Sequence, residues 1–165
     1  MRKSIEFAGL GMLAVLYWMT WSALNGPNPL PARIPTHFDI SGTPNAWGSP
    51  QILLLLPIVG TGIYLLITIL ASIPAAFHYS FRVEPENLSV VQDMTRTMIS
   101  WIKLEMICLF IYLQWSIIQA ARDRQWHMSP LMVPVFLVVV FATVGWHLVS
   151  ILSRAKSRTG SSEPV

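Results

Sequence analysis

The sequence is poor in charged residues. Only 12% of its 165 residues are Asp, Glu, Lys or Arg, whereas 53% are hydrophobic. A soluble domain of this size could not bury so much apolar surface in one core, so the composition excludes an ordinary soluble protein. The excess apolar side chains must face lipid, and we therefore predict an integral membrane protein.

Cysteine and the common catalytic motifs are also scarce. Cys108 is the single cysteine, so it has no second thiol with which to pair and gives no information about the redox compartment. The sequence contains no glycine-rich phosphate loop, no His-Glu-x-x-His motif and no nucleophile elbow. We therefore expect no cofactor, and we predict that the protein is not an enzyme.

Four apolar runs are long enough to cross a hydrocarbon layer of about 30 Å, which takes about 20 helical residues. They cover residues 7–24, 52–73, 99–121 and 131–152. The runs are continuously apolar and do not alternate, which favours helices over the strands of a barrel. The predicted fold is an all-α four-transmembrane-helix bundle over residues 1–155, followed by a disordered tail at 156–165.

The basic residues predict the orientation of this bundle. If the spans alternate, eight of the eleven fall on one side: Arg2, Lys3, Arg82, Arg96, Lys103, Arg154, Lys156 and Arg158. Such an excess marks the inner side, so we predict a multi-pass protein of the cytoplasmic membrane with both termini in the cytoplasm. The basic residues then anchor the protein at the lipid bilayer, and we expect no nucleic-acid partner. The first run is longer than the core of a secretory signal and has no cleavage site, so we expect a retained helix.

The first connection, residues 25–50, is extracytoplasmic in this topology and carries six prolines. Each proline restricts its own φ and biases its predecessor towards extended backbone, so we predict an ordered loop that begins as polyproline-like chain from Pro27 to Pro35. Gly42 is expected in a left-handed conformation, and Pro44 and Asn45 at the centre of a tight turn.

The second connection, residues 74–98, is predicted to be cytoplasmic and carries charges of both signs. Apolar residues recur at helical spacing from Leu88 to Met98, which indicates either a short amphipathic helix on the inner membrane surface or a packed connector.

Glu105 and His147 are the polar residues best placed to meet inside the membrane. The third helix leaves the cytoplasmic side and the fourth returns to it, so both residues lie about two turns inside the inner boundary. Lys103 is expected to point elsewhere and to extend to the interface. An intramembrane acid needs a tertiary partner, so we predict a Glu105–His147 pair, which is either a structural hydrogen bond or a proton-responsive pair.

His37 and Asp39 are two residues apart in the first loop, so on extended backbone both side chains point to one face. Two ligands do not make a metal site, and a third would have to come from Asp123 or His127 in the other outer loop. We therefore predict a polar pair that ties the loop to itself and no metal site.

The pattern from Leu30 to Ser49 is distinctive: Leu30-Pro31, then Ile34-Pro35-Thr36-His37-Phe38, then Gly42, Pro44 and Trp47-Gly48-Ser49. It resembles a bacterial integral membrane family that has a domain of unknown function between its first two helices. This family is related to the immunity protein of the sporulation-delaying toxin. Asn45 stands where that family usually has an acidic residue, and Pro50 where it usually has lysine.

The resemblance implies a non-enzymatic protein of immunity or sensor type, whose outer loop binds a peptide or an envelope partner. The residues implied in this binding loop are Arg33, Pro35, Thr36, His37, Phe38, Asp39, Gly42, Pro44, Asn45, Trp47 and Gly48. The output surface would be the cytoplasmic segment 77–96. Two alternatives remain: an accessory structural subunit of a larger membrane complex, and a small transporter or membrane enzyme.

Overall fold

We describe the fold from a computed structural model, in which residues 2–73, 77, 79 and 81–156 are described. Four helices dominate it: α1 (Arg2–Asn25), α2 (Leu55–Ser72), α3 (Leu88–Arg122) and α4 (Met132–Lys156). All four are long and apolar enough to cross a membrane, which is compatible with a multi-pass membrane protein. Short 3-10 turns precede two of them, η1 (Pro50–Leu54) before α2 and η3 (Pro85–Asn87) before α3.

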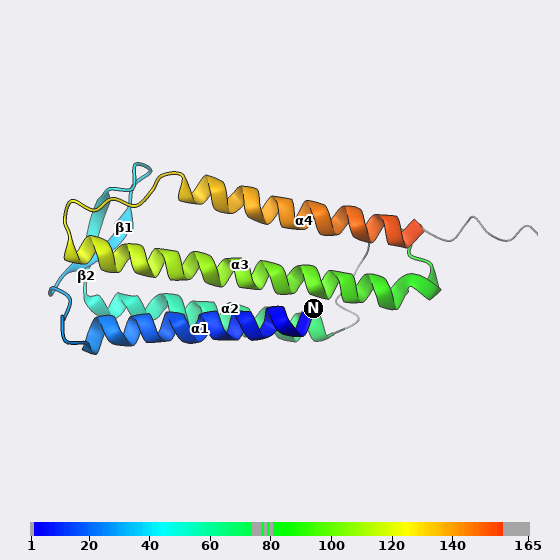
Figure 1. The fold of residues 1–165 in the computed structure, drawn as a ribbon, viewed down its shortest axis with the longest axis horizontal. Helices are drawn as coiled ribbons and strands as arrows, with labels where there is room; N and C mark the ends of the chain where they lie inside the picture. The colour runs from blue at the N-terminus through cyan, green and yellow to red at the C-terminus, as the bar shows by residue number, and fades with distance from the viewer. Residues whose placement is uncertain (1, 74–76, 78, 80, 157–165) are drawn as a thin grey trace, which may run out of the picture.

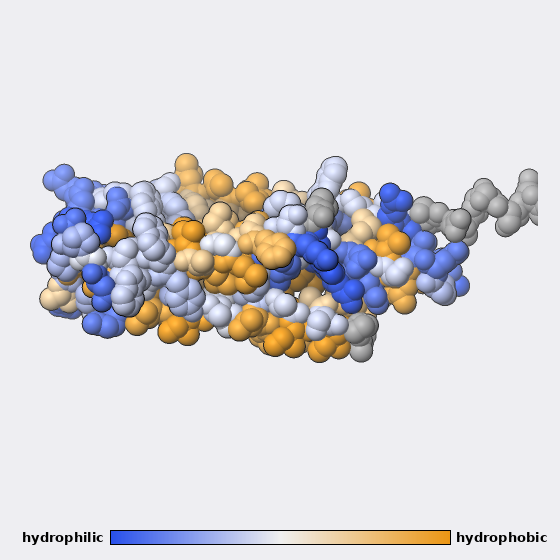
Figure 2. All heavy atoms as spheres, turned by 60° about the horizontal axis from the view of Figure 1, so that its bottom comes forward, coloured by the Kyte–Doolittle hydropathy of each residue, from blue (hydrophilic) through white to orange (hydrophobic). Residues whose placement is uncertain are grey.

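The helices are arranged around α3. Helices α1 and α2 lie along one side of α3, and α4 lies along the opposite side (Figure 1). Because α4 packs mainly on α3, the arrangement is more open than the predicted four-helix bundle. Hydrophilic atoms gather at both ends of the molecule and hydrophobic atoms cover the middle, as expected for side chains that face lipid (Figure 2).

Helix α3 is longer than its predicted span. The segment 88–98 does not form a separate surface helix but continues without a break into the apolar run. Its apolar residues have a partner that the sequence pattern did not identify, because Val91 packs with Ile151 and Ala155 near the end of α4. The predicted disordered tail is helical at Lys156, and its remaining residues, 157–165, lie outside the described residues.

The connection between α1 and α2 contains the two strands of the structure, so the fold is mostly helical and not all-α. Strand β1 (Ile34–Phe38) pairs antiparallel with β2 (Pro44–Gly48). Pro44 and Asn45 therefore lie in a strand and not at the centre of a turn, which was predicted wrongly. Proline is tolerated here because Pro44 is the first residue of its strand and both strands are edges.

The buried apolar side chains form three clusters along the helices. Near the hairpin, Ile34 and Leu53 pack with side chains of α1 and α3. In the middle, Leu13, Tyr64 and Ile107 join α1, α2 and α3. The third cluster is the one between α3 and α4 described above. We call the end with β1 and β2 the hairpin end and the opposite end the N-terminal end, because α1 begins there (Figure 1).

Candidate functional site

The turn of the hairpin is organised by the carboxylate of Asp39. One carboxylate oxygen accepts hydrogen bonds from the backbone N–H of Ser41 at 2.9 Å, from the Ser41 hydroxyl at 2.6 Å and from the backbone N–H of Thr43 at 3.0 Å. These donors, first among them the Ser41 hydroxyl, lower the pKa of Asp39 from its ordinary value. The turn is therefore held in one conformation while Asp39 is ionised.

The tip of the hairpin is attached to the connection between α3 and α4. Gly42 has a φ of +82°, so the predicted left-handed conformation is confirmed. The backbone N–H of Met128 donates a hydrogen bond of 2.9 Å to the Gly42 carbonyl. A Cβ on Gly42 would lie 1.8 Å from the Met128 carbonyl oxygen, so only glycine permits this close approach.

Aromatic side chains support the same connection from α3. The rings of Trp115 and Trp126 meet edge to face with centroids 5.4 Å apart, and Tyr112 packs beside Trp115. The Tyr112 hydroxyl also accepts a hydrogen bond from the backbone N–H of Ser129. The connection that receives the hairpin tip is thus fixed to α3.

The base of the hairpin is anchored in the helices. Ile34 is fully buried in the cluster with Ala23, Leu53 and Ile118, and Pro35 is buried as well. The Arg33 guanidinium donates to the Trp47 carbonyl at 3.2 Å, which closes the open end of the hairpin. Strand β1 therefore serves as the attachment of the hairpin to the helices.

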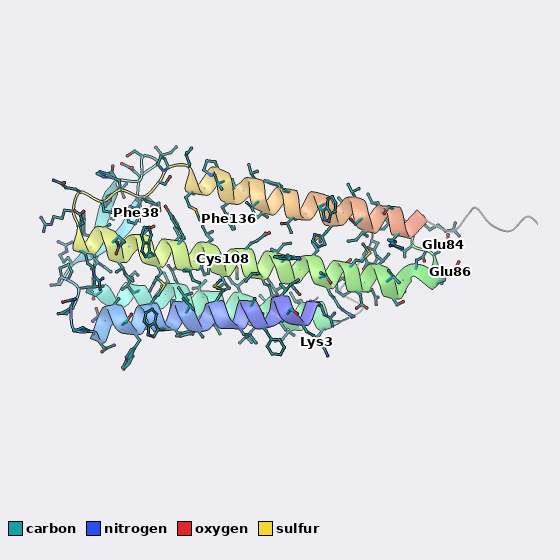
Figure 3. All side chains as sticks on the ribbon, viewed as in Figure 1. Lys3, Phe38, Glu84, Glu86, Cys108 and Phe136 are labelled. Atoms are coloured by element: carbon teal, nitrogen blue, oxygen red, sulfur yellow. The ribbon has the colours of Figure 1, made fainter. Side chains whose placement is uncertain are left out.

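Strand β2 lies on the outside of this attachment. Its three central residues, Asn45, Ala46 and Trp47, are exposed, and the strand carries no charged side chain. At the turn, Ile40 is 97% exposed. Figure 3 shows the hairpin end, where Phe38 is labelled, at the opposite end of the helices from Lys3, Glu84 and Glu86.

The predicted residues of the loop are therefore brought together in one hairpin, but with different contacts. His37 and Asp39 do not pair with each other: the His37 Nδ1 lies 2.6 Å from the Asn45 amide oxygen, whereas Asp39 binds its own turn. Asn45 of β2 is thus the side-chain hydrogen-bond partner of the His37 ring, whereas the backbone of His37 lies opposite Ala46. Among the described residues, no group of three or more His, Cys, Asp or Glu side chains could hold a metal ion.

The predicted Glu105–His147 pair is replaced by contacts that both involve Thr143. The Thr143 hydroxyl donates to one carboxylate oxygen of Glu105, while the other oxygen is buried and has no hydrogen-bond partner. The His147 Nδ1 lies 2.9 Å from the backbone carbonyl of Thr143, one turn earlier on α4. Helical rise predicted that Glu105 and His147 lie at the same depth. Thr143 and His147 lie one turn apart on the same face of α4, and the helix is offset along α3 by about one turn from the predicted alignment, so Thr143 meets Glu105 in place of His147.

The main ion pair of the helices was missed. Lys103 does not extend to the interface; its side chain is 2% exposed, and its ammonium lies 2.8 Å from Glu6 in α1 and 2.8 Å from the Thr68 hydroxyl in α2. The ammonium also lies 4.2 Å from the centroid of the Tyr64 ring. Glu6 accepts further hydrogen bonds from Tyr64 and from Ser100, each of 2.6 Å.

A signal for this pair was present in the sequence. Glu6 and Lys103 have opposite charge, and each lies within about one turn of the start of a predicted span, the two spans running in the same direction. Glu6 was overlooked because the first apolar run begins one residue later.

A second buried polar contact lies closer to the hairpin. Gln114 of α3 is fully buried, and its amide nitrogen donates to the Thr20 hydroxyl of α1 at 2.7 Å and to the Leu53 carbonyl of η1 at 3.1 Å. Three segments therefore meet at one side chain.

The fold and the hairpin define a class: a mostly helical protein with four helices apolar enough to cross a membrane, the first two of which are joined by a packed β-hairpin. A DUF1648 domain, described as a domain of unknown function, is found at residues 12–61. This match covers most of α1, the whole hairpin and the beginning of α2. No curated protein and no solved structure matches the chain.

Proposed function

We propose that the protein is a non-enzymatic membrane receptor of immunity or sensor type, and that its hairpin binds an extended peptide or an extended segment of an envelope protein. The observation that carries the proposal is the outer edge of β2. The sheet has two strands only, and β2 leaves the edge opposite β1 without a strand partner in the part of the chain that the structure describes.

An unpaired strand edge presents backbone N–H and C=O groups to which another extended chain can add. Proteins commonly protect such edges with charged side chains, but β2 reads Pro44-Asn45-Ala46-Trp47-Gly48 and carries no charge. Trp47 is 39% exposed and offers an aromatic surface beside this edge. These features suit strand addition, in which the backbone provides affinity and the flanking side chains provide selectivity.

The rigid mounting of the hairpin supports this role. A free two-stranded hairpin is marginally stable, but this one is anchored at its base by Ile34 and at its tip by the Gly42–Met128 hydrogen bond. A pre-formed strand loses little conformational freedom on binding, which favours affinity. The positive-inside distribution of basic residues favours a position of the hairpin outside the cytoplasm, where a secreted peptide could reach it.

The same contacts provide a route for a signal. Occupancy of β2 would act on the hairpin tip, which contacts Met128 and hence the segment leading into α4. Because α4 packs mainly on α3, a shift of α4 disturbs few other contacts. We propose that the signal leaves the protein at the N-terminal end, where α4 ends. The output surface expected from the sequence, segment 77–96, includes residues 78 and 80, which lie outside the described residues.

Site-specific photo-crosslinking tests the binding role. With p-benzoylphenylalanine at Asn45, illumination of cells is expected to yield one discrete peptide adduct, which is then sequenced. The same probe at Asn28, an exposed residue of the same connection outside the hairpin, is the matched control. Adducts that are identical at the two positions would contradict the proposal.

A titration then tests the mode of binding. A synthetic peptide of the crosslinked sequence is titrated against the protein in nanodiscs. Ala46→Lys places a charge at the strand edge and is expected to weaken binding at least tenfold, whereas Asn28→Lys adds the same charge elsewhere and leaves binding unchanged. Equal affinity of both variants would show that β2 is not the binding edge.

An accessory subunit of a larger membrane complex is the second candidate. It is favoured by α4, where Phe141 and Trp146 are 71% and 75% exposed and could contact another membrane protein. Purification from native membranes separates the two candidates, because a subunit brings down a stoichiometric partner without any added peptide.

A further inference from the structure

A polar cavity of about 460 Å³ lies between α1, α2 and α3 at the N-terminal end, far from the hairpin. Its size falls within the range of about 300–1,000 Å³ that is typical of ligand sites. Three cationic side chains line it, Arg2, Arg96 and Lys103, but only one anionic side chain, Glu6. The cavity therefore carries an excess of positive charge.

The excess is located at Arg2 and Arg96. Lys103 is compensated by Glu6 at 2.8 Å, so this pair is neutral as a whole. The two arginines share a single acid, Asp93, at 3.6 Å and 3.5 Å, and the Asp93 side chain is 71% exposed. Such long, exposed ion pairs contribute little, so an anion with better geometry could replace Asp93.

Two contacts fix the orientation of the Arg96 guanidinium. Its Nε donates to the Ala71 carbonyl at 3.1 Å, and its guanidinium carbon lies 5.6 Å from the centroid of the Phe77 ring. The hydrogen bond uses Nε, and the aromatic contact involves the guanidinium group as a whole. Neither contact uses the N–H donors of the two terminal nitrogens. A guanidinium held in this way presents a planar pair of donors that matches the oxygens of a phosphate.

The lining of the cavity is not wholly polar. Ala71 of α2 and Ile99 of α3 line it beside the charged side chains. Charged groups at the cavity thus adjoin apolar side chains of two helices that are apolar enough to cross a membrane. Basic cavities between membrane helices at the inner surface are suited to phospholipid head groups.

We propose that this cavity binds a phosphate group, and that its source is the head group of an anionic phospholipid with Arg2 and Arg96 as the ligands. Glu6 and Lys103 form the neutral floor of the site. The apolar residues near its mouth would contact the acyl chains. This site is independent of peptide binding by the hairpin.

Native mass spectrometry of the full-length protein released from mixed micelles tests the proposal. The protein is expected to retain one phosphatidylglycerol molecule and to bind it at least tenfold more tightly than phosphatidylcholine. Arg96→Gln and Arg2→Gln should each reduce this preference severalfold. Arg96→Lys should lie between Arg96→Gln and the unmodified protein, because lysine keeps the charge but lacks the paired donors.

Arg82→Gln is the matched control, since Arg82 also lies towards the N-terminal end but has an 89% exposed side chain and pairs with Glu84. An equal loss in Arg82→Gln and Arg96→Gln, or equal binding of the two lipids, would overturn the proposal. If Arg96→Gln does not fold because the contact with Ala71 is lost, Arg2→Gln provides the same comparison. A thermal-stability measurement in lipid-free detergent distinguishes the two sources of phosphate. Stabilisation by added phosphatidylglycerol but not by inorganic phosphate supports the head group. Stabilisation by inorganic phosphate indicates a soluble anion at this site and contradicts the lipid assignment.

Discussion

The buried pair of Glu6 and Lys103 predicts an unequal response to the loss of either partner. The Lys103 side chain is 2% exposed, whereas that of Glu6 is 30% exposed. Glu6→Gln would leave the Lys103 ammonium with neutral neighbours, namely the introduced amide, the Thr68 hydroxyl and the Tyr64 ring, and without a counter-charge. Removing one partner of a buried ion pair typically costs about 3–5 kcal/mol in the free energy of unfolding, and we expect Glu6→Gln to lie in this range.

Lys103→Met should cost less. It leaves a carboxylate that still accepts hydrogen bonds from Tyr64 and Ser100 and still reaches solvent, so we expect a loss of about 1–2 kcal/mol. The double variant removes both charges, and a buried pair replaced by neutral groups is often close to neutral in stability. It should therefore be more stable than Glu6→Gln alone, with a coupling of at least about 1 kcal/mol.

Reversible unfolding in mixed micelles of a mild detergent and dodecyl sulfate, followed by tryptophan fluorescence, gives these free energies. Arg82→Gln removes an exposed ion pair and should change the free energy of unfolding by no more than about 0.5 kcal/mol. Equal losses in Glu6→Gln and Lys103→Met, together with an additive double variant, would refute the argument that Lys103 is the buried partner.

Three further predictions concern the hairpin and the polar contact near it. Gly42→Ala should raise hydrogen exchange throughout the hairpin, because a Cβ meets the Met128 carbonyl at a φ of +82°, while Gly62→Ala, whose Cβ meets no atom within 4 Å, should not. Gln114→Leu should lower the free energy of unfolding by about 1–2 kcal/mol, measured as above, because the Leu53 carbonyl loses a buried donor. The lowered pKa of Asp39 stabilises the turn fully above its ordinary value of 3.8, and this contribution is lost as the pH falls through the lowered value. Proteolysis of the hairpin should therefore be constant from about pH 8 to 5 and rise below about pH 4, and Asp39→Asn should remove the dependence on pH.

The hairpin shows which features of the loop could be predicted from the loop residues themselves. The glycine at position 42 was correctly expected at a left-handed position, because a turn between extended segments needs one. The density of prolines predicted polyproline-like chain from Pro27 to Pro35, but the last two of these residues, Ile34 and Pro35, belong to strand β1. Pairing depends on which backbone groups meet across the turn, and burial of Ile34 against α1 and α3 favours the paired form. Neither effect is visible in the residues of the loop alone.

Inside the helices, the contacts of Glu105 and Lys103 could not be predicted from the local sequence either. Helical rise counted from the predicted span ends placed His147 level with Glu105. The span ends do not determine how far one helix is shifted along its neighbour, and Thr143, one turn away on α4, contacts Glu105 instead. Lys103 was expected at the interface because long basic side chains commonly extend there. Its partner lies 97 residues earlier in the chain, at the start of α1.

The sequence by itself determined that four helices form and, apart from the start of α3, roughly where each begins and ends. About 20 consecutive apolar residues can satisfy their backbone in lipid only as a helix. Only the tertiary structure decided that α3 lies at the centre, that Glu6 pairs with Lys103 and that the hairpin tip contacts Met128. Lipid is as apolar as the side chains facing it, so hydrophobicity gives little preference for one arrangement of helices over another. Close packing and a few buried polar contacts make that choice, and each of these contacts joins residues far apart in the chain.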